Sequence, residues 1–329
     1  MTAPAESRLG LVGAEGRGSV FMEALARTPH VQLAGVSSHT PETLGPLAAG
    51  CRVFPNWRAL LDPRLLDGLI IATKPATHYA IAREALAAGL PVLLESPLAL
   101  DLAEAMDLKR LADERALVMV DHSHLAHPAC RFLKELAAGG AASPIRAIRG
   151  YAGGCGPAAD ASSPLWTWGA RTIALCIDLL NASEPEDLSA RVVKYRRTSE
   201  GEGKTIELRF DFAKDTDVRL RLSNILEQET DYFAVYFDQM TLVYDGLGAD
   251  ALSVHPPLPD FSVPTDEGQA VELPAEDPLV TVLRSFALAI TNRTDDGESL
   301  NLGVDVVALL ARCQAILGES VAPTPMPVQ

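Results

Sequence analysis

Apolar residues in the first third of the chain follow two alternating patterns. Short runs in which every residue is apolar, such as 69–72, are typical of strands buried on both faces, and segments with apolar residues at helical spacing separate them. The runs predict strands at 9–12, 31–36, 53–54, 69–72, 92–94 and 117–120. The other segments predict helices at 21–26, 40–49, 59–61, 77–88 and 102–114. We therefore predict an α/β domain over residues 1–121, with a doubly wound parallel sheet covered by helices on both faces.

The pattern changes after residue 121, where strands follow one another without helices between them. Alternation of apolar and charged residues in 218–222 is typical of an antiparallel strand with one face in water. The predicted strands are 190–195, 206–212, 218–222, 232–237 and 240–244, and the predicted helices are 129–136, 172–180, 278–291 and 302–317. We therefore predict a second, α+β domain over residues 122–329, with a mostly antiparallel open sheet.

The composition argues against several functions. The 329 residues include 43 acidic and 28 basic side chains, and the formal charge of −15 argues against nucleic-acid or acidic-membrane partners. No run of about 18 apolar residues predicts a membrane-spanning helix. Residues 1–8 lack the apolar core of a signal peptide, so a cytoplasmic location is expected. The five cysteines, at positions 51, 130, 155, 176 and 313, form no CxxC pair, and no metal site is predicted.

A glycine-rich turn joins the first predicted strand to the first predicted helix. Gly13 and Gly18 stand at the first and third positions of GxGxxG, a sequence in which the turn and the helix N-terminus hold a pyrophosphate. Glu15 stands at the second position, where its carboxylate is expected in the path of the phosphates, and the neighbouring Gly16 is expected to relax the turn. The alternative is a tight turn with a structural role only.

The end of the second predicted strand bears on the choice of dinucleotide. An acidic residue there ordinarily bonds the adenine-ribose hydroxyls, but the chain reads Ser37, Ser38, His39. NAD therefore lacks the carboxylate that usually bonds the hydroxyls of its adenine ribose. The missing acid also removes repulsion against a 2′-phosphate, to which Ser38, His39 or Arg17 can donate hydrogen bonds. We expect NADP or NAD as the cofactor, with NADP favoured.

Several short motifs follow one another along the chain: Gly13–Gly18, Ala72–His78, Leu94–Ala99, Val120–His122, Pro128 with Leu133–Leu136, and Leu165–Thr172 followed by a helix to Leu180. This succession resembles the Gfo/Idh/MocA oxidoreductases. The resemblance covers nearly the whole chain. It implies a Rossmann domain that carries NAD or NADP and a C-terminal domain whose open sheet makes homo-oligomer contacts. It also implies reversible oxidation of a sugar or cyclitol hydroxyl at the junction of the two domains.

The resemblance extends the expected cofactor-binding set beyond the glycine turn. That set is Gly13, Glu15, Gly16, Arg17, Gly18, Ser38, His39, Thr73, Pro75, His78, Glu95 and Pro97. Within it, His78 is expected to cap or pack at the start of its helix. The backbone near Glu95 is expected to lie against the nicotinamide ribose.

The residues of the family's proton relay are absent from this chain. The lysine of the family's Glu-Lys-Pro motif is Ser96 here, and the aspartate and histidine of its second-domain signature fall on Thr167 and Arg171. A serine, a threonine and a guanidinium do not act unaided as a base near neutral pH. The expected substrate cleft comprises Glu95, Ser96, Trp166, Thr167, Trp168 and Arg171.

Three other residues are candidate catalytic substitutes for that relay. Lys74 follows the fourth predicted strand at the ligand-binding edge of the sheet, where desolvation favours a neutral amine. His122 and His124 lie at the crossover between the two predicted domains. His127 extends this pair to HxHxxH, but imidazoles from a strand end and a helix start are not expected to converge on a metal.

Aromatic and basic side chains indicate the chemistry of the ligand. Trp166 and Trp168 either stack on a sugar ring or pack in the core. Lys74 and Arg171, if both line the cleft, attract a carboxylate or a phosphate. The expected partner is therefore a small molecule, sugar-like or anionic.

Two classes of function remain. In the first, the protein is an NAD(P)-dependent oxidoreductase with an atypical active site. In the second, it is a pseudoenzyme that acts as a ligand sensor, regulator or assembly partner, which the loss of the three relay residues favours. The glycine turn, Glu95 and Pro97 are retained, so we take the oxidoreductase as the first hypothesis.

Overall fold

The computed structural model describes residues 6–38, 44, 50–115, 117–139, 144–154, 163–198, 201–212, 216–248 and 251–319. The chain divides into two compact units that are discontinuous in sequence. The N-terminal unit contains the described residues up to Ala126 together with Glu276–Val307, and the C-terminal unit contains those of His127–Ala275 and from Ala308 onward. The sequence-based division at residues 121 and 122 places Glu276–Val307 in the second domain. The spacing of apolar residues predicts that this segment is helical, but it does not predict which of the two cores the helix packs into.

The N-terminal unit contains a parallel sheet of six strands in the order β3-β2-β1-β4-β5-β6, as the apolar runs predict. The strands are β1 (Ser7–Val12), β2 (Val31–Ser37), β3 (Arg52–Phe54), β4 (Gly68–Ile71), β5 (Val92–Glu95) and β6 (Val118–Asp121). The helices are α1 (Arg17–Leu25), α2 (His78–Ala87), α3 (Leu102–Arg115), α6 (Pro278–Asn292) and the first part of α7 (Glu298–Leu317), with 3₁₀ turns η2 (Trp57–Leu60), η3 (Pro75–Thr77) and η4 (Ser123–Ala126). The helix predicted at 40–49 lies outside the described residues except for Leu44.

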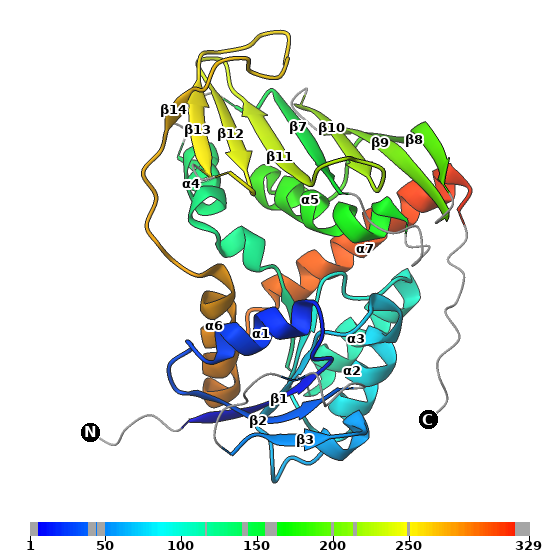
Figure 1. Cartoon of the computed structure of the whole chain (residues 1–329), viewed down its shortest axis with the longest axis vertical. Coiled ribbons are helices and arrows are strands. Elements are labelled where there is room, and N and C mark those ends of the chain that lie inside the picture. Colours follow the sequence, from blue (N-terminus) through cyan, green and yellow to red (C-terminus); the bar gives the residue numbers. More distant parts are fainter. Residues whose placement is uncertain are drawn as a thin grey trace. The chain divides into compact units, whose positions relative to one another are not determined.

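Helices cover both faces of this sheet. Helix α1 contacts α6 on one side, and α2 contacts α3 on the other (Figure 1). The apolar residues of the strands meet the helices in a core that includes Leu9, Leu11, Phe21, Ile70 and Phe286. Helix α6 joins this core because Phe286 is fully buried, and a methyl group at Gly68 of β4 would lie 3.1 Å from its ring.

The C-terminal unit contains a mostly antiparallel sheet whose described strands follow the order β14-β13-β12-β11-β7-β10-β9-β8. Strands β7 and β10 pair in parallel, and the other neighbouring pairs of described strands are antiparallel. The strands are β7 (Ala147–Gly153), β8 (Asp187–Thr198), β9 (Gly201–Phe212), β10 (Thr216–Ser223), β11 (Thr230–Tyr236), β12 (Thr241–Asp245), β13 (Leu252–His255) and β14 (Gln269–Ala270). Helix α4 (Pro128–Ala138) and helix α5 (Pro164–Leu180) complete the unit with the end of α7. The sequence pattern missed β7, β13 and β14, and it placed the start of α5 eight residues too late.

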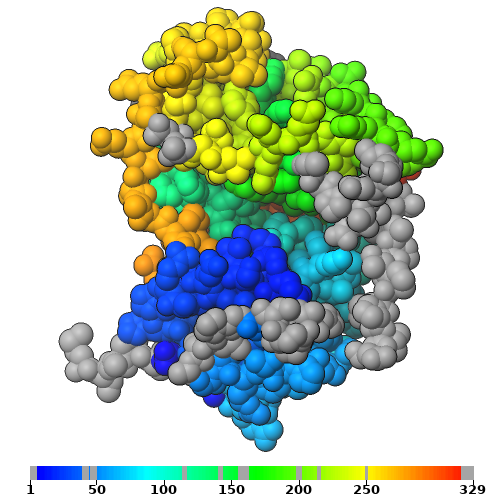
Figure 2. All heavy atoms as spheres, in the orientation of Figure 1, coloured from blue at the N-terminus to red at the C-terminus, as the bar shows by residue number. Residues whose placement is uncertain are grey.

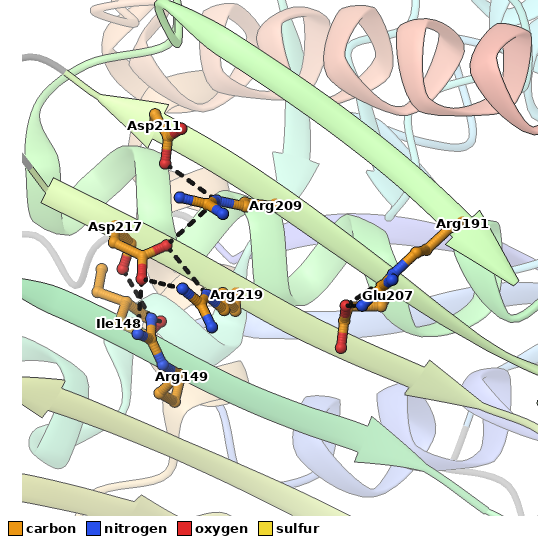
Figure 3. A network of polar contacts seen from close by, with 8 residues as sticks. All are labelled: Ile148, Arg149, Arg191, Glu207, Arg209, Asp211, Asp217 and Arg219. Carbon is orange, nitrogen blue, oxygen red and sulfur yellow. Dashed lines mark hydrogen bonds and ion pairs between the residues drawn. The ribbon is translucent and has the colours of Figure 1, made fainter. Parts of the chain in front are cut away.

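The two faces of this second sheet differ in polarity. Val218, Leu220 and Leu222 of β10 are fully buried, and helix α5 contacts β10, β7 and β9. Figure 3 shows the charged side chains of the same strands, in which Asp217 lies 2.7 Å from Arg149 Nη2 and 3.1 Å from Arg219 Nη2. The network continues from Asp217 to Arg209 and Asp211, while Glu207 pairs with Arg191. Alternation with a period of two thus gives one apolar face and one charged face, as predicted.

Helix α7 is the one described helix that is long and apolar enough to cross a membrane, judged by length and composition alone. Core helices meet the same criterion. Val306, Val307, Leu310 and Cys313 of α7 are fully buried inside the protein. These four residues pack in the interior of the protein, whereas Ile316 near the end of α7 is half exposed.

Candidate active site

The carboxyl ends of β1 and β4 lie side by side at the centre of the parallel sheet. The two strands pair in register, with Val12 opposite Ile71, but the chain leaves β1 toward β2 and leaves β4 toward β5. This divergence is the topological switch point at which doubly wound sheets bind ligands. Gly13 follows β1 with φ of 87°, and a methyl group there would lie 2.7 Å from the carbonyl oxygen of Ala72. Glycine is therefore required where the two loops meet.

The remaining glycines of the turn bring α1 close to β1 and leave its N-terminus open. A methyl group at Gly18 would lie only 1.9 Å from the carbonyl oxygen of Gly13, so the helix begins directly against the turn. Gly16 is the N-cap of α1 and receives no side-chain capping bond, and a methyl group on it would have no atom within 4 Å. The Gly18 and Ser19 amides donate to the Glu15 and Gly16 carbonyls at 3.0 and 3.2 Å, so the first turn is closed by backbone bonds and no side chain covers it. A helix N-terminus without a side-chain cap and with open space beside it fits an anion such as the pyrophosphate of a dinucleotide.

Glu15 lies elsewhere than the sequence led us to expect. Ser38 Oγ donates a hydrogen bond of 2.9 Å to Glu15 Oε1, which places the Glu15 carboxylate at the end of β2. The expectation that this carboxylate obstructs the phosphates is therefore wrong. His39, which follows Ser38, lies outside the described residues.

Arg17 also differs from its expected role as a donor at the end of β2. Its Nη2 donates to Asp121 Oδ2 at 2.8 Å, and its Nε lies 3.4 Å from Glu95 Oε1. Glu95 and Asp121 end β5 and β6, which β1 and β4 separate from β2 in the sheet. The guanidinium is thus directed toward the opposite half of the sheet from the end of β2.

Glu95 and Asp121 form a carboxyl pair at the ends of adjacent strands. The two residues stand opposite each other in register, with side chains 19% and 1% exposed. Burial first and the negative charge of Asp121 second raise the pKa of Glu95 to about 8, against the opposing effect of Arg17. Glu95 therefore holds a proton at neutral pH. Asp121 was not predicted as a site residue, although it lies in the motif Val120–His122.

His78 connects the loops that follow β4 and β5. Its Nδ1 lies 2.9 Å from the carbonyl oxygen of Pro97, and its Nε2 lies 3.0 Å from that of Thr73. Burial lowers the pKa of His78, so the ring is neutral and donates to one of these carbonyls at a time. The side chain begins α2 and holds Thr73 and Pro97 in place, consistent with the structural role expected for it.

The candidate catalytic substitutes lie in different surroundings. Lys74 is exposed and precedes the turn η3 that begins at Pro75. His122 is buried, and its ring lies edge-on to that of His124, with 5.9 Å between the centroids. Among the described residues, Ser96 Oγ is buried without a hydrogen-bond partner. An orphaned hydroxyl at the family's lysine position fits a contact with a bound ligand.

The Arg17 ion pair leads to a test of stability. We expect Arg17→Met to lower the free energy of unfolding by about 2 kcal/mol at pH 7, because it leaves the buried Asp121 carboxylate uncompensated. The estimate is reduced because the Arg17 side chain is 44% exposed. Urea unfolding of both single variants and of Arg17→Met with Asp121→Asn measures the coupling. If the loss of unfolding free energy in the double variant equals the sum of the two single losses, the ion pair makes no net contribution to stability.

The candidate cleft residues of the C-terminal unit lie on α5. Thr167 and Arg171 are one turn apart within α5, although the sequence pattern placed both before the start of the helix. Arg171 Nη2 lies 2.7 Å from Asp231 Oδ2 and donates to the Tyr244 hydroxyl at 3.1 Å, so its charge is compensated within this unit. The sequence analysis did not identify Asp231, because it lies on β11 with no motif around it.

The two tryptophans of α5 have different environments. Trp166 is buried, and its Nε1 donates to Gln314 Oε1 at 2.6 Å, which supports core packing over sugar stacking. Trp168 is half-buried, and Thr167 between them is exposed.

Metal binding finds no support in the parts of the chain that the structure describes. There, no group of three or more His, Cys, Asp or Glu side chains could hold a metal ion. Within the HxHxxH sequence, His127 belongs to the C-terminal unit and accepts a hydrogen bond from the Ala129 amide at the start of α4.

Comparison with known proteins shows in which family this strand, glycine turn and helix occur. Residues 7–122 match the family model described as the oxidoreductase family, NAD-binding Rossmann fold. A solved structure of a protein described as an oxidoreductase, from Magnetospirillum magnetotacticum MS-1, is 33% identical with a TM-score of 0.85, covering 94% of this chain and 100% of that one. The chain belongs to the Gfo/Idh/MocA oxidoreductase family. Its N-terminal unit is the NAD-binding domain of that family, which confirms a nicotinamide dinucleotide as the cofactor class.

Curated relatives of this Gfo/Idh/MocA protein match shorter segments. The UDP-N-acetylglucosamine 3-dehydrogenase of Acidithiobacillus ferrooxidans is 37% identical over 131 residues, 39% of this chain and 41% of the relative. Its solved structure has a TM-score of 0.78 at 25% identity and covers 94% of this chain and 97% of its own. The inositol 2-dehydrogenase of Leifsonia xyli subsp. xyli is 32% identical over 157 residues, 46% of each chain. The chain thus matches less than half the length of these curated relatives in sequence.

Proposed function

We propose that the protein is an NAD(P)-dependent oxidoreductase that interconverts a hydroxyl and a carbonyl group on a sugar-like small molecule. The observation that carries this proposal is the glycine turn from Gly13 to Gly18, which brings the N-terminus of α1 against the switch point of a family-typical NAD-binding sheet. Two curated relatives are named as dehydrogenases of a nucleotide sugar and of inositol, which supports this substrate class. These relatives lend no support to the alternative of a sensor or regulator.

The residues of the turn are suited to hold the cofactor. The amides at the start of α1 would bind the pyrophosphate, and the loops joined by His78 would border the nicotinamide half. When bound, the nicotinamide supplies a hydride acceptor or donor. Ser96 Oγ would hydrogen-bond the ligand in place of the family's lysine.

We further propose that Glu95 carries the proton of the reaction. The carboxyl group ends β5 and is buried beside Asp121 and the Arg17 guanidinium, so burial first and these two charges second set its proton affinity. In the oxidation direction it would take the hydroxyl proton, and in reduction it would return it. Its pKa of about 8 suits this exchange near neutral pH, whereas Lys74, one of the three candidate substitutes, is exposed.

Within the C-terminal unit, α5 carries two residues that we propose contact a sugar. Thr167 is exposed and Trp168 half-buried on α5, and an aromatic face suits the C–H edges of a sugar ring. The charged face of the sheet in Figure 3 is where we expect copies of the chain to meet in a homo-oligomer. This assembly remains a prediction from the family resemblance.

Absorbance at 340 nm tests the proposed activity. The protein is mixed with oxidised or reduced NAD or NADP and with UDP-N-acetylglucosamine, inositol or dTDP-sugars, and steady turnover is expected with at least one pair. The Glu95→Gln variant should bind the reduced cofactor as the parent does but lose most of kcat with little change in KM. Cofactor binding without turnover across these substrates would favour the sensor alternative.

A further inference from the structure

We propose that Glu15 recognises the adenosine ribose of the cofactor and thereby makes this protein selective for NAD over NADP. The inference rests on cofactor binding by the N-terminal unit and is independent of turnover. It reverses the preference for NADP drawn from the sequence. That preference assumed that no acid lies at the end of β2 and that Arg17 lies near it.

The first step is the position of the Glu15 carboxylate. The Gly13 amide donates to the Ser37 carbonyl at 3.1 Å, which holds the glycine turn against the last residue of β2. Ser38 follows directly and donates to Glu15 Oε1 at 2.9 Å. The carboxylate therefore stands at the carboxyl end of β2, although its residue belongs to the turn after β1. This end of β2 is where dinucleotide-binding sheets usually carry the acid that bonds the ribose.

The second step concerns the chemistry of that carboxylate. An ionised carboxylate only accepts hydrogen bonds, and its two oxygens can accept from both hydroxyls of an unmodified ribose. A 2′-phosphate offers negative charge in place of one of these donors, so it is repelled at the same position. The Glu15 side chain is exposed and α1 lies on the surface of this unit (dark blue in Figure 2), so a ligand can reach the carboxylate.

A 2′-phosphate needs a basic side chain near the end of β2. Arg17 pairs with Asp121 and Glu95, on the far side of β1 and β4 from β2. The segment that follows β2, residues 38–50, contains no lysine or arginine in its sequence. Arg52 begins the neighbouring strand β3, and its guanidinium lies over the Phe54 ring. The usual arginine for a 2′-phosphate is therefore missing from this stretch.

The turn tolerates a glutamate at the second glycine position because of its neighbour Gly16. The backbone of Glu15 does not have positive φ, whereas Gly16 has φ of 55° and open space beside it. Close approach of the phosphates is therefore provided by Gly16. Glu15 is free of that role and serves the ribose.

Binding titrations of the full-length protein test the assignment. Nicotinamide fluorescence is followed on adding NADH or NADPH to the parent, to Glu15→Gln and to Glu23→Gln, which removes an exposed carboxylate from α1 and matches the change in net charge. We expect the parent to bind NADH at least about tenfold more tightly than NADPH. Glu15→Gln should reduce this ratio by about tenfold or more, mainly through tighter binding of NADPH, and Glu23→Gln should preserve it.

The possible results separate this inference from the proposed function. Equal or tighter binding of NADPH by the parent would overturn the role of Glu15, as would an unchanged ratio in Glu15→Gln. In both cases cofactor binding itself would stand, and with it the oxidoreductase proposal. Failure of the parent to bind either dinucleotide would overturn both. Because Glu15 is exposed, added salt should also weaken the selectivity of the parent and have less effect in Glu15→Gln.

Discussion

Gly18→Ala is expected to destabilise the N-terminal unit by about 3 kcal/mol or more and to abolish NADH binding. The new methyl group would lie 1.9 Å from the carbonyl oxygen and 2.7 Å from the carbonyl carbon of Gly13. Both are backbone atoms, so no side-chain rotation relieves the overlap, and α1 must move away from the turn. The amides at its N-terminus then lose their place beside β1. Urea unfolding and nicotinamide fluorescence measure the two effects.

Gly10→Ala is the matched control for this prediction. It makes the same chemical change in β1, but its methyl group would meet the end of the Leu66 side chain at 2.4 Å, which can rotate away. We expect a smaller loss of stability, about 1–2 kcal/mol, with NADH binding retained. If Gly18→Ala binds NADH as tightly as Gly10→Ala does, the close approach of α1 is not required for the cofactor site.

Glu95→Gln is expected to make the protein more stable at pH 8, by on the order of 3 kcal/mol, while having little effect at pH 4. Burial raises the pKa of Glu95 from 4.5 to about 8. Between these values the unfolded chain releases the proton and the folded chain retains it. Rising pH therefore favours unfolding over this window, and the loss is complete above about pH 8. Glutamine has no proton to release, so this contribution disappears in the variant.

Differences between variants isolate this effect from other titrating groups. Burial lowers the pKa of His78 and of His127 below 6.5, which opposes the Glu95 contribution as the pH rises toward 6.5 but is common to parent and variant. Glu207→Gln is the control of opposite sign, because hydrogen bonds from Arg191 and Arg221 lower the pKa of Glu207. The difference in unfolding free energy between Glu207→Gln and the parent should be constant from pH 5 to 8. If the difference between Glu95→Gln and the parent were also constant over that range, Glu95 would be ionised in the folded protein.

The same titration links stability to the proposed chemistry. A carboxyl group that holds a proton up to about pH 8 donates in the reduction direction at neutral pH and accepts in the oxidation direction at higher pH. Oxidation should therefore become faster as the pH rises toward 8. Burial beside Asp121 destabilises the charged form of Glu95, and that cost at a strand end is typical of functional sites.

Much of the fold could be predicted from local patterns. The apolar runs located all six strands of the parallel sheet, and the glycine turn located its switch point. Predictions were poorer where the signal is not local. Strand β7 lies between sequence-distant β10 and β11, and helix α6 joins the core of a sheet that ended 157 residues before it. Such pairings depend on which surfaces meet in three dimensions.

For the site, the sequence by itself determined the residue types and the turn. A strand, a turn with Gly13 and Gly18, and a helix specify a phosphate-binding geometry because glycine alone fits the close backbone contacts. Tertiary structure decided where the charges lie. Glu15 reaches a serine 23 residues away, and Arg17 reaches an aspartate 104 residues away. Strand order brings these partners together, and long flexible side chains adopt the orientation that their distant neighbours stabilise.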